Sequence, residues 1–166
     1  MRDETLSAAL RKVLQVLLCL VPWTALLVHE DFFVPFVTLK ALALRMLLEV
    51  AGVVYLALAL VDKRARPPKT FLLVAVFLFY ASTVLSTLLS TSPAASFYGT
   101  PERMEGLLDR LHWLLFLLVL AGVVRLERRF LWTFLVALFS AGIIISVFGV
   151  FQYFDLREHV PYVLTW

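Results

Sequence analysis

The sequence has little of what metal, redox or nucleotide chemistry requires. It contains one cysteine, Cys19, and three histidines among its 166 residues. A single cysteine excludes an internal disulfide and a cysteine-based metal centre, and the histidines have no spacing typical of a metal site. The glycine-rich motifs G-x-x-x-x-G-K and G-x-G-x-x-G are also missing. We therefore expect neither a metal nor any other cofactor.

Charged side chains are scarce too. Asp, Glu, Lys and Arg make up 16% of the chain, whereas 62% is hydrophobic and the mean hydropathy is +0.93. Soluble domains are about 45–50% apolar, and one of this length could not bury so much apolar surface, so membrane lipid must be the solvent. The net charge of +3 does not indicate a nucleic-acid partner, because the basic residues form short clusters between apolar runs.

Five apolar runs predict an all-α, polytopic membrane helical bundle. Helices are expected throughout, because an open sheet edge would leave backbone groups unpaired in hydrocarbon. The first run is short for a bilayer that needs about 20 residues, so we expect its helix to extend back toward Ala8. Pro22 is expected to kink this helix or to mark its last turns. The predicted spans cover about residues 13–28, 41–61, 70–90, 107–124 and 130–150.

The basic clusters predict the orientation of the chain. The N-terminal tail, residues 62–69 and residues 125–129 hold most of the 15 Lys and Arg residues, and five spans place these three segments on one side. The positive-inside rule assigns that side to the cytoplasm. We therefore expect the N-terminus inside and the C-terminus outside, with aromatic residues crowding the outer ends of the spans.

A short polar loop, residues 96–106 with the sequence SFYGTPERMEG, separates the third and fourth runs. At membrane depth such a loop must face water or a polar cavity. Gly99 and Gly106 permit close backbone approach, since glycine has no Cβ. Thr100 and Pro101 suit the N-cap and the first position of a helix, so this loop offers an alternative, earlier start for the fourth helix.

Arg103 is the candidate anion ligand in this loop. Arginine is permanently charged and binds phosphate oxygens bidentately, and a helix start directs free amide groups at an anion. The diphosphate of a lipid-linked glycan is such an anion at the membrane surface. The alternative is a structural role, in which Arg103 pairs with Glu102, Glu105 or a lipid phosphate.

Arg45 and Glu49 are charged residues at the start of the second predicted span. They are four residues apart and share one helical face. A charge in a span costs at least about 2.5–3.5 kcal/mol on insertion scales, which favours pairing of the two in the bundle interior. They either line a polar cavity for a diphosphate or glycan, or form a structural ion pair that fixes helix packing. His112, in the fourth span, is expected to be a polar packing residue rather than a base.

Two segments carry a resemblance to a known family. They are the run G-T-P-E-R-M-E-G-L with Gly99, Arg103, Gly106 and Leu107, preceded by Phe97 and Tyr98, and the run K-A-L at Lys40, followed by Arg45 and Glu49. Together they resemble the N-terminal portion of the O-antigen ligase/polymerase superfamily, which comprises bacterial multi-spanning glycosyltransferases acting on lipid-linked glycans. Both segments fall on the same predicted side of the membrane.

The resemblance implies a metal-independent glycosyltransferase of the bacterial inner membrane. Such an enzyme transfers or polymerises glycan from a polyprenyl-diphosphate-linked donor to a glycan or lipid acceptor at the outer face. The resemblance makes Arg103, Gly99, Gly106, Arg45 and Glu49 the candidate ligands of the diphosphate or glycan. Family members have more spans and a large outer loop whose arginines and histidine are implicated in transfer. We therefore expect this chain to be the N-terminal part of a longer enzyme and inactive alone, with no catalytic residue identified.

Two other classes of function stay open. A small transporter or channel subunit would oligomerise to enclose a path lined by Arg45, Glu49 and Arg103. A noncatalytic membrane scaffold would use none of these residues as ligands. The sequence also leaves open the choice between ligase and polymerase activity, the identity of the sugar and the oligomeric state.

Overall fold

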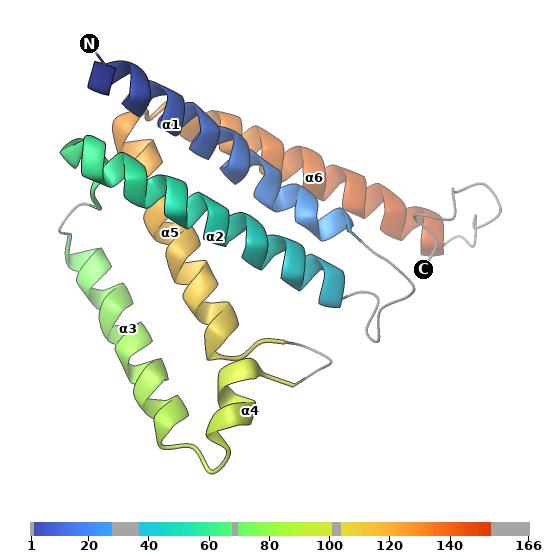
Figure 1. Ribbon diagram of the computed structural model, residues 1–166. Helices are drawn as coiled ribbons and strands as arrows, with labels where there is room; N and C mark the ends of the chain where they lie inside the picture. Colours follow the sequence, from blue (N-terminus) through green and yellow to red (C-terminus); the bar gives the residue numbers. More distant parts are fainter. Residues whose placement is uncertain (1, 28–36, 68–69, 101–103, 154–166) are drawn as a thin grey trace.

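The computed structural model describes residues 2–27, 37–67, 70–100 and 104–153. Within these ranges every regular element is a helix (Figure 1), which confirms the all-α prediction. The elements are α1 (Arg2–Leu20), the 3₁₀ helix η1 (Val21–Leu26), α2 (Thr38–Val61), the 3₁₀ helix η2 (Lys63–Ala65), α3 (Phe71–Leu88), α4 (Pro93–Tyr98), α5 (Leu107–Leu126) and α6 (Phe130–Tyr153).

Among the described residues, five helical segments are long and apolar enough to cross a membrane, so the chain has the architecture of a multi-pass membrane protein. Each segment corresponds to one predicted span. The side of the membrane on which each end lies stays a prediction. The segments are Glu4–Leu26, Thr38–Val61, Phe71–Leu88, Leu107–Leu126 and Phe130–Phe151.

The first span differs from the prediction in where it begins. Its α-helix starts at Arg2, well before the expected position. It ends at Leu20, and Pro22 opens the 3₁₀ helix that follows. Proline has no amide hydrogen to donate to the carbonyl four residues earlier. Pro22 therefore ends the regular α-helix, as the sequence predicts.

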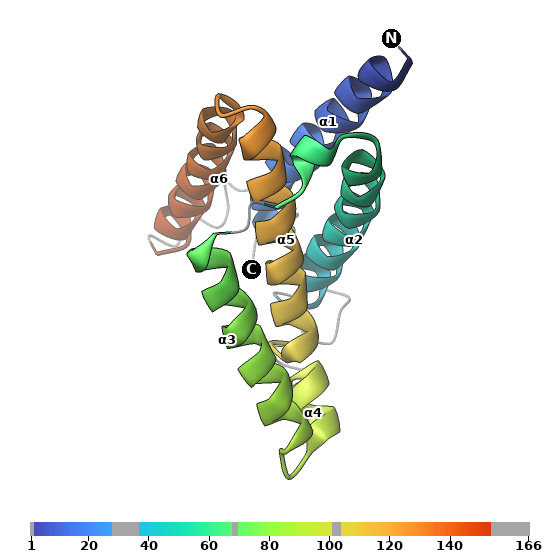
Figure 2. The same ribbon diagram turned by 90° about the vertical axis from the view of Figure 1, so that its left-hand side faces the viewer.

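The spanning helices alternate in direction, so their connections lie toward two ends of the bundle (Figures 1 and 2). α1 and α2 lie side by side, α5 crosses behind α2, and α6 runs beside α1 (Figure 1). The start of α1, residues 62–67 and residues 127–129 lie toward one end, here called the basic end. The start of α2, α4 and residues 104–107 lie toward the other, here called the loop end.

The best-buried part of the core joins α1, α2, α5 and the start of α6. Because lipid tails are as apolar as these side chains, close packing rather than exclusion of water holds such helices together. The buried cluster comprises Leu14, Leu18, Ala51, Tyr55, Leu58, Ala65, Val119, Val123, Phe130 and Phe134.

Glycines let α2 and α5 approach closely. A Cβ at Gly122 of α5 would lie 2.5 Å from Tyr55 Cε2 and 2.7 Å from the carbonyl oxygen of Ala65. On the opposite helix, a Cβ at Gly52 would lie 3.0 Å from Leu115 Cδ2. Each helix thus presents a small residue where the other inserts a large one. The Tyr55 hydroxyl completes the contact by donating to the Ala65 carbonyl at 2.9 Å.

α3 and α6 are much less covered by protein. Within the apolar windows of the spans, 6% of α3 and 11% of α6 is buried, against 28% for both α2 and α5. α3 packs on α4 and α5 and stands apart from α1 and α6 (Figure 1). Helices that are apolar on their exposed faces are suited to contact with lipid.

Candidate functional site

A groove of about 760 Å³ opens toward the loop end between η1, α2, α5 and α6. Most of its wall is apolar, and three charged residues, Lys40, Glu105 and Asp109, also line it. We call it the apolar groove. Its other lining residues are Val21, Pro22, Thr24, Ala25, Val37, Ala41, Leu44, Trp113, Phe116, Phe134, Leu138, Ala141, Gly142 and Ile145.

A second cavity, of about 740 Å³, lies between the end of α3, α4 and the start of α5. Its wall is rich in hydroxyl groups, and we call it the hydroxyl pocket. Glu105 lines this pocket as well as the apolar groove, so the two cavities meet at the loop that precedes α5. The remaining lining residues are Thr83, Ser86, Thr87, Leu89, Ser90, Thr91, Ser96, Gly106, Leu107 and Arg110.

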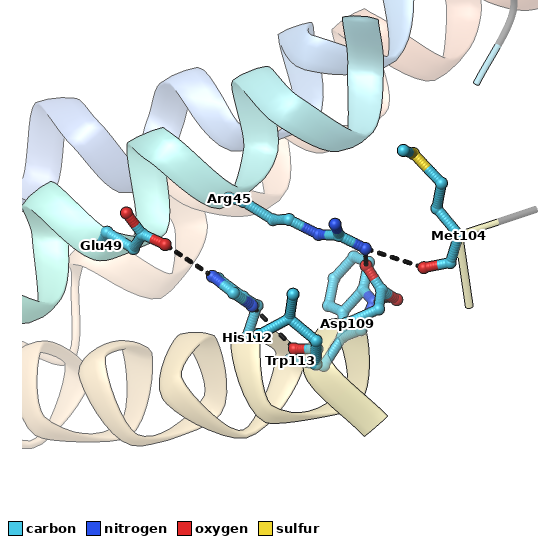
Figure 3. Close-up of polar contacts among 7 residues, drawn as sticks. Arg45, Glu49, Met104, Asp109, His112 and Trp113 are labelled. Atoms are coloured by element: carbon cyan, nitrogen blue, oxygen red, sulfur yellow. Dashed lines mark hydrogen bonds and ion pairs between the residues drawn. The ribbon is translucent and has the colours of Figure 1, made fainter. Parts of the chain in front are cut away.

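Arg45 of α2 reaches across to α5 and to the loop before it (Figure 3). Its Nη2 donates to the Met104 carbonyl at 2.7 Å and lies 3.5 Å from Asp109 Oδ1. Asp109 is held in turn by Trp113, one helical turn further on, whose Nε1 donates to Oδ2 at 3.1 Å. The side chains of Arg45 and Asp109 are 12% and 16% exposed, so this ion pair is largely shielded from solvent and lipid.

This geometry corrects the predicted pairing of Arg45 with Glu49. The two residues do share a side of α2, but each reaches a different partner on α5 (Figure 3). Arg45 pairs with Asp109, and Glu49 contacts His112. The prediction used only spacing along one helix, which brings residues four apart close together but says nothing of a better partner on the next helix.

His112 is buried, and both of its ring nitrogens are engaged. Nδ1 lies 2.7 Å from the Leu108 carbonyl oxygen, and Nε2 lies 3.2 Å from Glu49 Oε1. A carbonyl oxygen only accepts, so Nδ1 must carry a hydrogen. The contact between Nε2 and Glu49 then needs one further proton, on the ring or on the carboxyl group. Either way the pair has no net charge, which lowers the cost of placing it within a span.

Glu49 is nevertheless two-thirds exposed, with 67% of its side-chain surface uncovered near the middle of α2. His112 lines neither the apolar groove nor the hydroxyl pocket. The expectation of a polar packing residue that bonds across helices therefore describes His112 better than a role as a base.

Gly99 and Gly106 lie against each other. Gly99 has φ +80°, in the region that favours glycine, and a Cβ on it would lie 2.7 Å from the amide nitrogens of Glu105 and Gly106. A Cβ on Gly106 would collide with the backbone of residues 97–99. The two glycines therefore close the loop between α4 and α5, and their predicted contact with a ligand is not tested by this geometry.

The alternative helix start at Thr100 is wrong, whereas the predicted start of the fourth span at residue 107 is confirmed. α5 begins at Leu107, after Gly106. The backbone carbonyl of Thr100 accepts a hydrogen bond from the Met104 amide at 2.7 Å, and Met104 has φ 53°. Pro101 and Arg103 lie outside the described residues, so the prediction that Arg103 is a ligand stays a prediction.

Comparison with known proteins identified no relative of this chain. No family model matches the chain, no curated protein matches its sequence, and no solved structure matches its fold.

The structure thus gathers part of the predicted site and adds residues that the sequence did not single out. Arg45 and the glycine loop meet at the loop end, whereas Glu49 lies apart with His112. Within the described ranges no cluster of His, Cys, Asp and Glu could hold a metal ion. Two features of the sequence could have pointed to these added residues. One is the helical spacing that places Asp109 beside Trp113, and the other is the series of hydroxyl residues at the end of the third run.

Proposed function

We propose that the loop end binds a polyprenyl-diphosphate-linked glycan, and that the chain belongs to a membrane glycosyltransferase of the O-antigen ligase/polymerase type. In this proposal the protein lies in the bacterial inner membrane, with the loop end at the outer face.

One observation carries the proposal. The two segments on which the resemblance rests are distant in sequence and meet in space, since Arg45 Nη2 donates to the Met104 carbonyl across a separation of 59 residues. Arg103 precedes Met104 directly in the sequence. Short motifs in leucine-rich helices arise by chance, but chance gives no reason for two of them to form one site.

The surroundings of this contact suit an amphipathic ligand. The apolar groove offers a wall for an isoprenoid chain, and the hydroxyl pocket beside it offers polar groups. Both cavities fall within the range of about 300–1,000 Å³ that is typical of ligand sites. Lys40 lines the groove at the start of α2, where a cationic group can face a diphosphate.

The reaction class follows from this ligand. An acceptor hydroxyl oxygen would bond to the anomeric carbon of the donor sugar while the bond from that carbon to the diphosphate breaks. The hydroxyl proton would pass to a base, which the described residues do not identify. Cationic groups near the diphosphate would stabilise the charge that develops on it as it departs.

Binding of a bare polyprenyl diphosphate to the chain in lipid nanodiscs tests the proposal. We expect tight binding of the diphosphate and much weaker binding of the corresponding polyprenol. Charge-assisted hydrogen bonds contribute about 1.5–3 kcal/mol, so Arg103→Ala should lower the affinity by roughly tenfold or more. The matched control is Arg129→Ala, which removes an exposed arginine at the basic end and should leave the affinity unchanged.

Equal affinities for diphosphate and polyprenol, or equal losses in the two variants, would refute the proposed site. A second assay follows glycan transfer in cells that carry the complete gene. Arg103→Lys keeps the charge but loses the bidentate fork, so it should retain part of the activity, whereas Arg103→Ala should lose most of it at equal membrane abundance.

A further inference from the structure

We infer that the hydroxyl pocket binds the sugar residue attached to the diphosphate, and so selects glycan-carrying lipids over bare ones. This inference rests on the proposed function. It concerns a different cavity from the apolar groove, with Glu105 as the one lining residue that the two share. Of the residues that line the pocket, the family resemblance singles out Gly106 and Leu107.

Two hydroxyl groups on the pocket wall, those of Thr83 and Thr87, are left as acceptors. Thr83 Oγ1 and Thr87 Oγ1 donate to the carbonyls of Phe79 and Thr83, at 2.9 Å and 3.0 Å. Each hydroxyl has one hydrogen and two lone pairs. Both threonines have therefore used their hydrogen within α3 and keep lone pairs that can accept from a ligand.

A hydrogen bond between Ser90 and Ser96 joins two parts of the pocket wall. Ser96 Oγ donates to Ser90 Oγ at 2.7 Å, and the Ser92 amide also donates to Ser90 Oγ, at 3.2 Å. These bonds join the end of α3 to α4 and hold the wall in place. The pocket is therefore a built cavity between helices rather than a row of hydroxyls facing lipid.

Two charged residues in the described part of the pocket wall, Arg110 and Glu105, have opposite signs. Arg110 of α5 adds fixed donors, and Glu105 adds acceptors. Both are exposed, and neither side chain forms a hydrogen bond or an ion pair with another residue in the described part of the chain. The carboxylate of Glu105 would repel a free anion, and the guanidinium of Arg110 would repel a free cation. A neutral group that both donates and accepts at many positions fits this wall, and a sugar ring is such a group.

The position of the pocket agrees with a sugar near the membrane surface. Thr83 lies about 8 Å from the end of α3 along the helix axis, given a rise of 1.5 Å per residue. The pocket is thus within reach of the headgroup layer, which adds about 5–8 Å on each side of the hydrocarbon. Glu105 connects it to the apolar groove, so one lipid-linked glycan can place its chain in the groove and its first sugar in the pocket.

The test compares two probes on the full chain in nanodiscs: a bare polyprenyl diphosphate, and the same lipid carrying a single hexose or N-acetylhexosamine. The measured quantity is the ratio of their affinities. Of the two sugar-carrying lipids, we expect the one with the higher affinity to bind several-fold more tightly than the bare lipid. Losing a hydrogen bond costs about 0.5–1.5 kcal/mol, or roughly twofold or more in affinity. Arg110→Leu and the double variant Ser86→Ala/Thr87→Val should therefore each reduce this ratio by about threefold, toward one.

Ser82→Ala is the matched control. Ser82 lies on the same helix and donates to the Phe79 carbonyl, as Thr83 does, but it does not line the pocket. It should leave the ratio unchanged, and the thermal stability of each variant shows whether the helices still pack.

Three outcomes overturn the inference: the sugar adds no affinity in the wild type, the pocket variants leave the ratio unchanged, or Ser82→Ala lowers it as much as they do. In each of these cases the bare lipid still binds and the proposed function stands. If the bare diphosphate fails to bind, the proposed function itself falls.

Discussion

The two ends of the bundle are built differently. Toward the basic end, α2 and α5 interlock through Gly122 and Tyr55, and the Tyr55 hydroxyl donates a hydrogen bond to the Ala65 carbonyl in η2. Toward the loop end, the helices separate around two cavities, and the contacts between α2 and α5 become polar. The basic end is closely packed, and we call it the closed end. At the loop end, an ion pair joins α2 to α5, and Gly99 and Gly106 close the loop between α4 and α5.

This difference suggests a division of labour. A membrane bundle needs one region where helices fit closely enough to fix their arrangement, because lipid gives no hydrophobic drive for their association. Once that region exists, the opposite end can carry cavities and partly exposed charges. Overpacking at the closed end should therefore cost the most stability, and substitutions of cavity-wall residues that break no ion pair should mainly change binding.

The largest effect is expected from Gly122→Leu at the closed end. Its Cβ alone would overlap a buried ring and a backbone carbonyl, neither of which can move cheaply. Most of the protein should then aggregate, as followed by size-exclusion chromatography in detergent. Gly142→Leu is the control, since a Cβ at Gly142 meets nothing within 4 Å. If both variants behave alike, the closed end does not hold the bundle together.

A smaller effect is expected from Arg45→Leu, which leaves Asp109 without its cation. An unpaired charge in a span costs about 2.5–3.5 kcal/mol at the centre of a helix and less near its end, so we expect a loss of about 2 kcal/mol in the free energy of unfolding. Arg45→Leu/Asp109→Asn should recover much of it, because asparagine can still accept from Trp113. Steric trapping in lipid bicelles measures both, and a double variant as unstable as the single one would count against this pair.

Tyr55→Phe tests the hydrogen bond of the closed end. The ring packing stays, but the Ala65 carbonyl loses its donor, which should cost about 1 kcal/mol. The same steric-trapping measurement applies. Tyr98→Phe, at an exposed tyrosine of α4, should have no measurable effect and serves as the control. Equal stability of wild type and Tyr55→Phe would show that this bond contributes nothing.

Glu49→Gln should have the smallest effect. The amide of glutamine can donate to Nε2 of a neutral His112 and so keep the contact without a charge. Hydrogen bonds between membrane helices average about 0.6 kcal/mol, so the free energy of unfolding should change by less than this amount. A loss of several times that size would mean that the negative charge of Glu49 itself is needed.

The sequence predicts the five spans well because hydrocarbon imposes long apolar helices. It predicts Pro22 as the end of the first α-helix for an equally local reason. It fails at Arg45, whose partner Asp109 lies on another helix, because helical spacing describes neighbours on one helix only. It also fails at Thr100, a residue suited to an N-cap, because α5 begins only at Leu107.

The cavities could not be predicted from the sequence at all. The threonines and serines at the end of α3 show helical spacing in the sequence, but only the placement of α4 and of the start of α5 turns them into the wall of a pocket. The apolar groove depends in the same way on how α6 passes η1 and α5.

The most direct test of the central claim is to locate a bound lipid on the wild-type chain. A polyprenyl diphosphate with a photoreactive group on its isoprenoid chain is cross-linked in nanodiscs, and the labelled peptides are identified by mass spectrometry. The account predicts labelling of the groove wall, at Trp113 and around Ala141 and Ile145, which an excess of unlabelled diphosphate suppresses. Labelling spread over the exposed faces of α3 and α6, without competition, would contradict it.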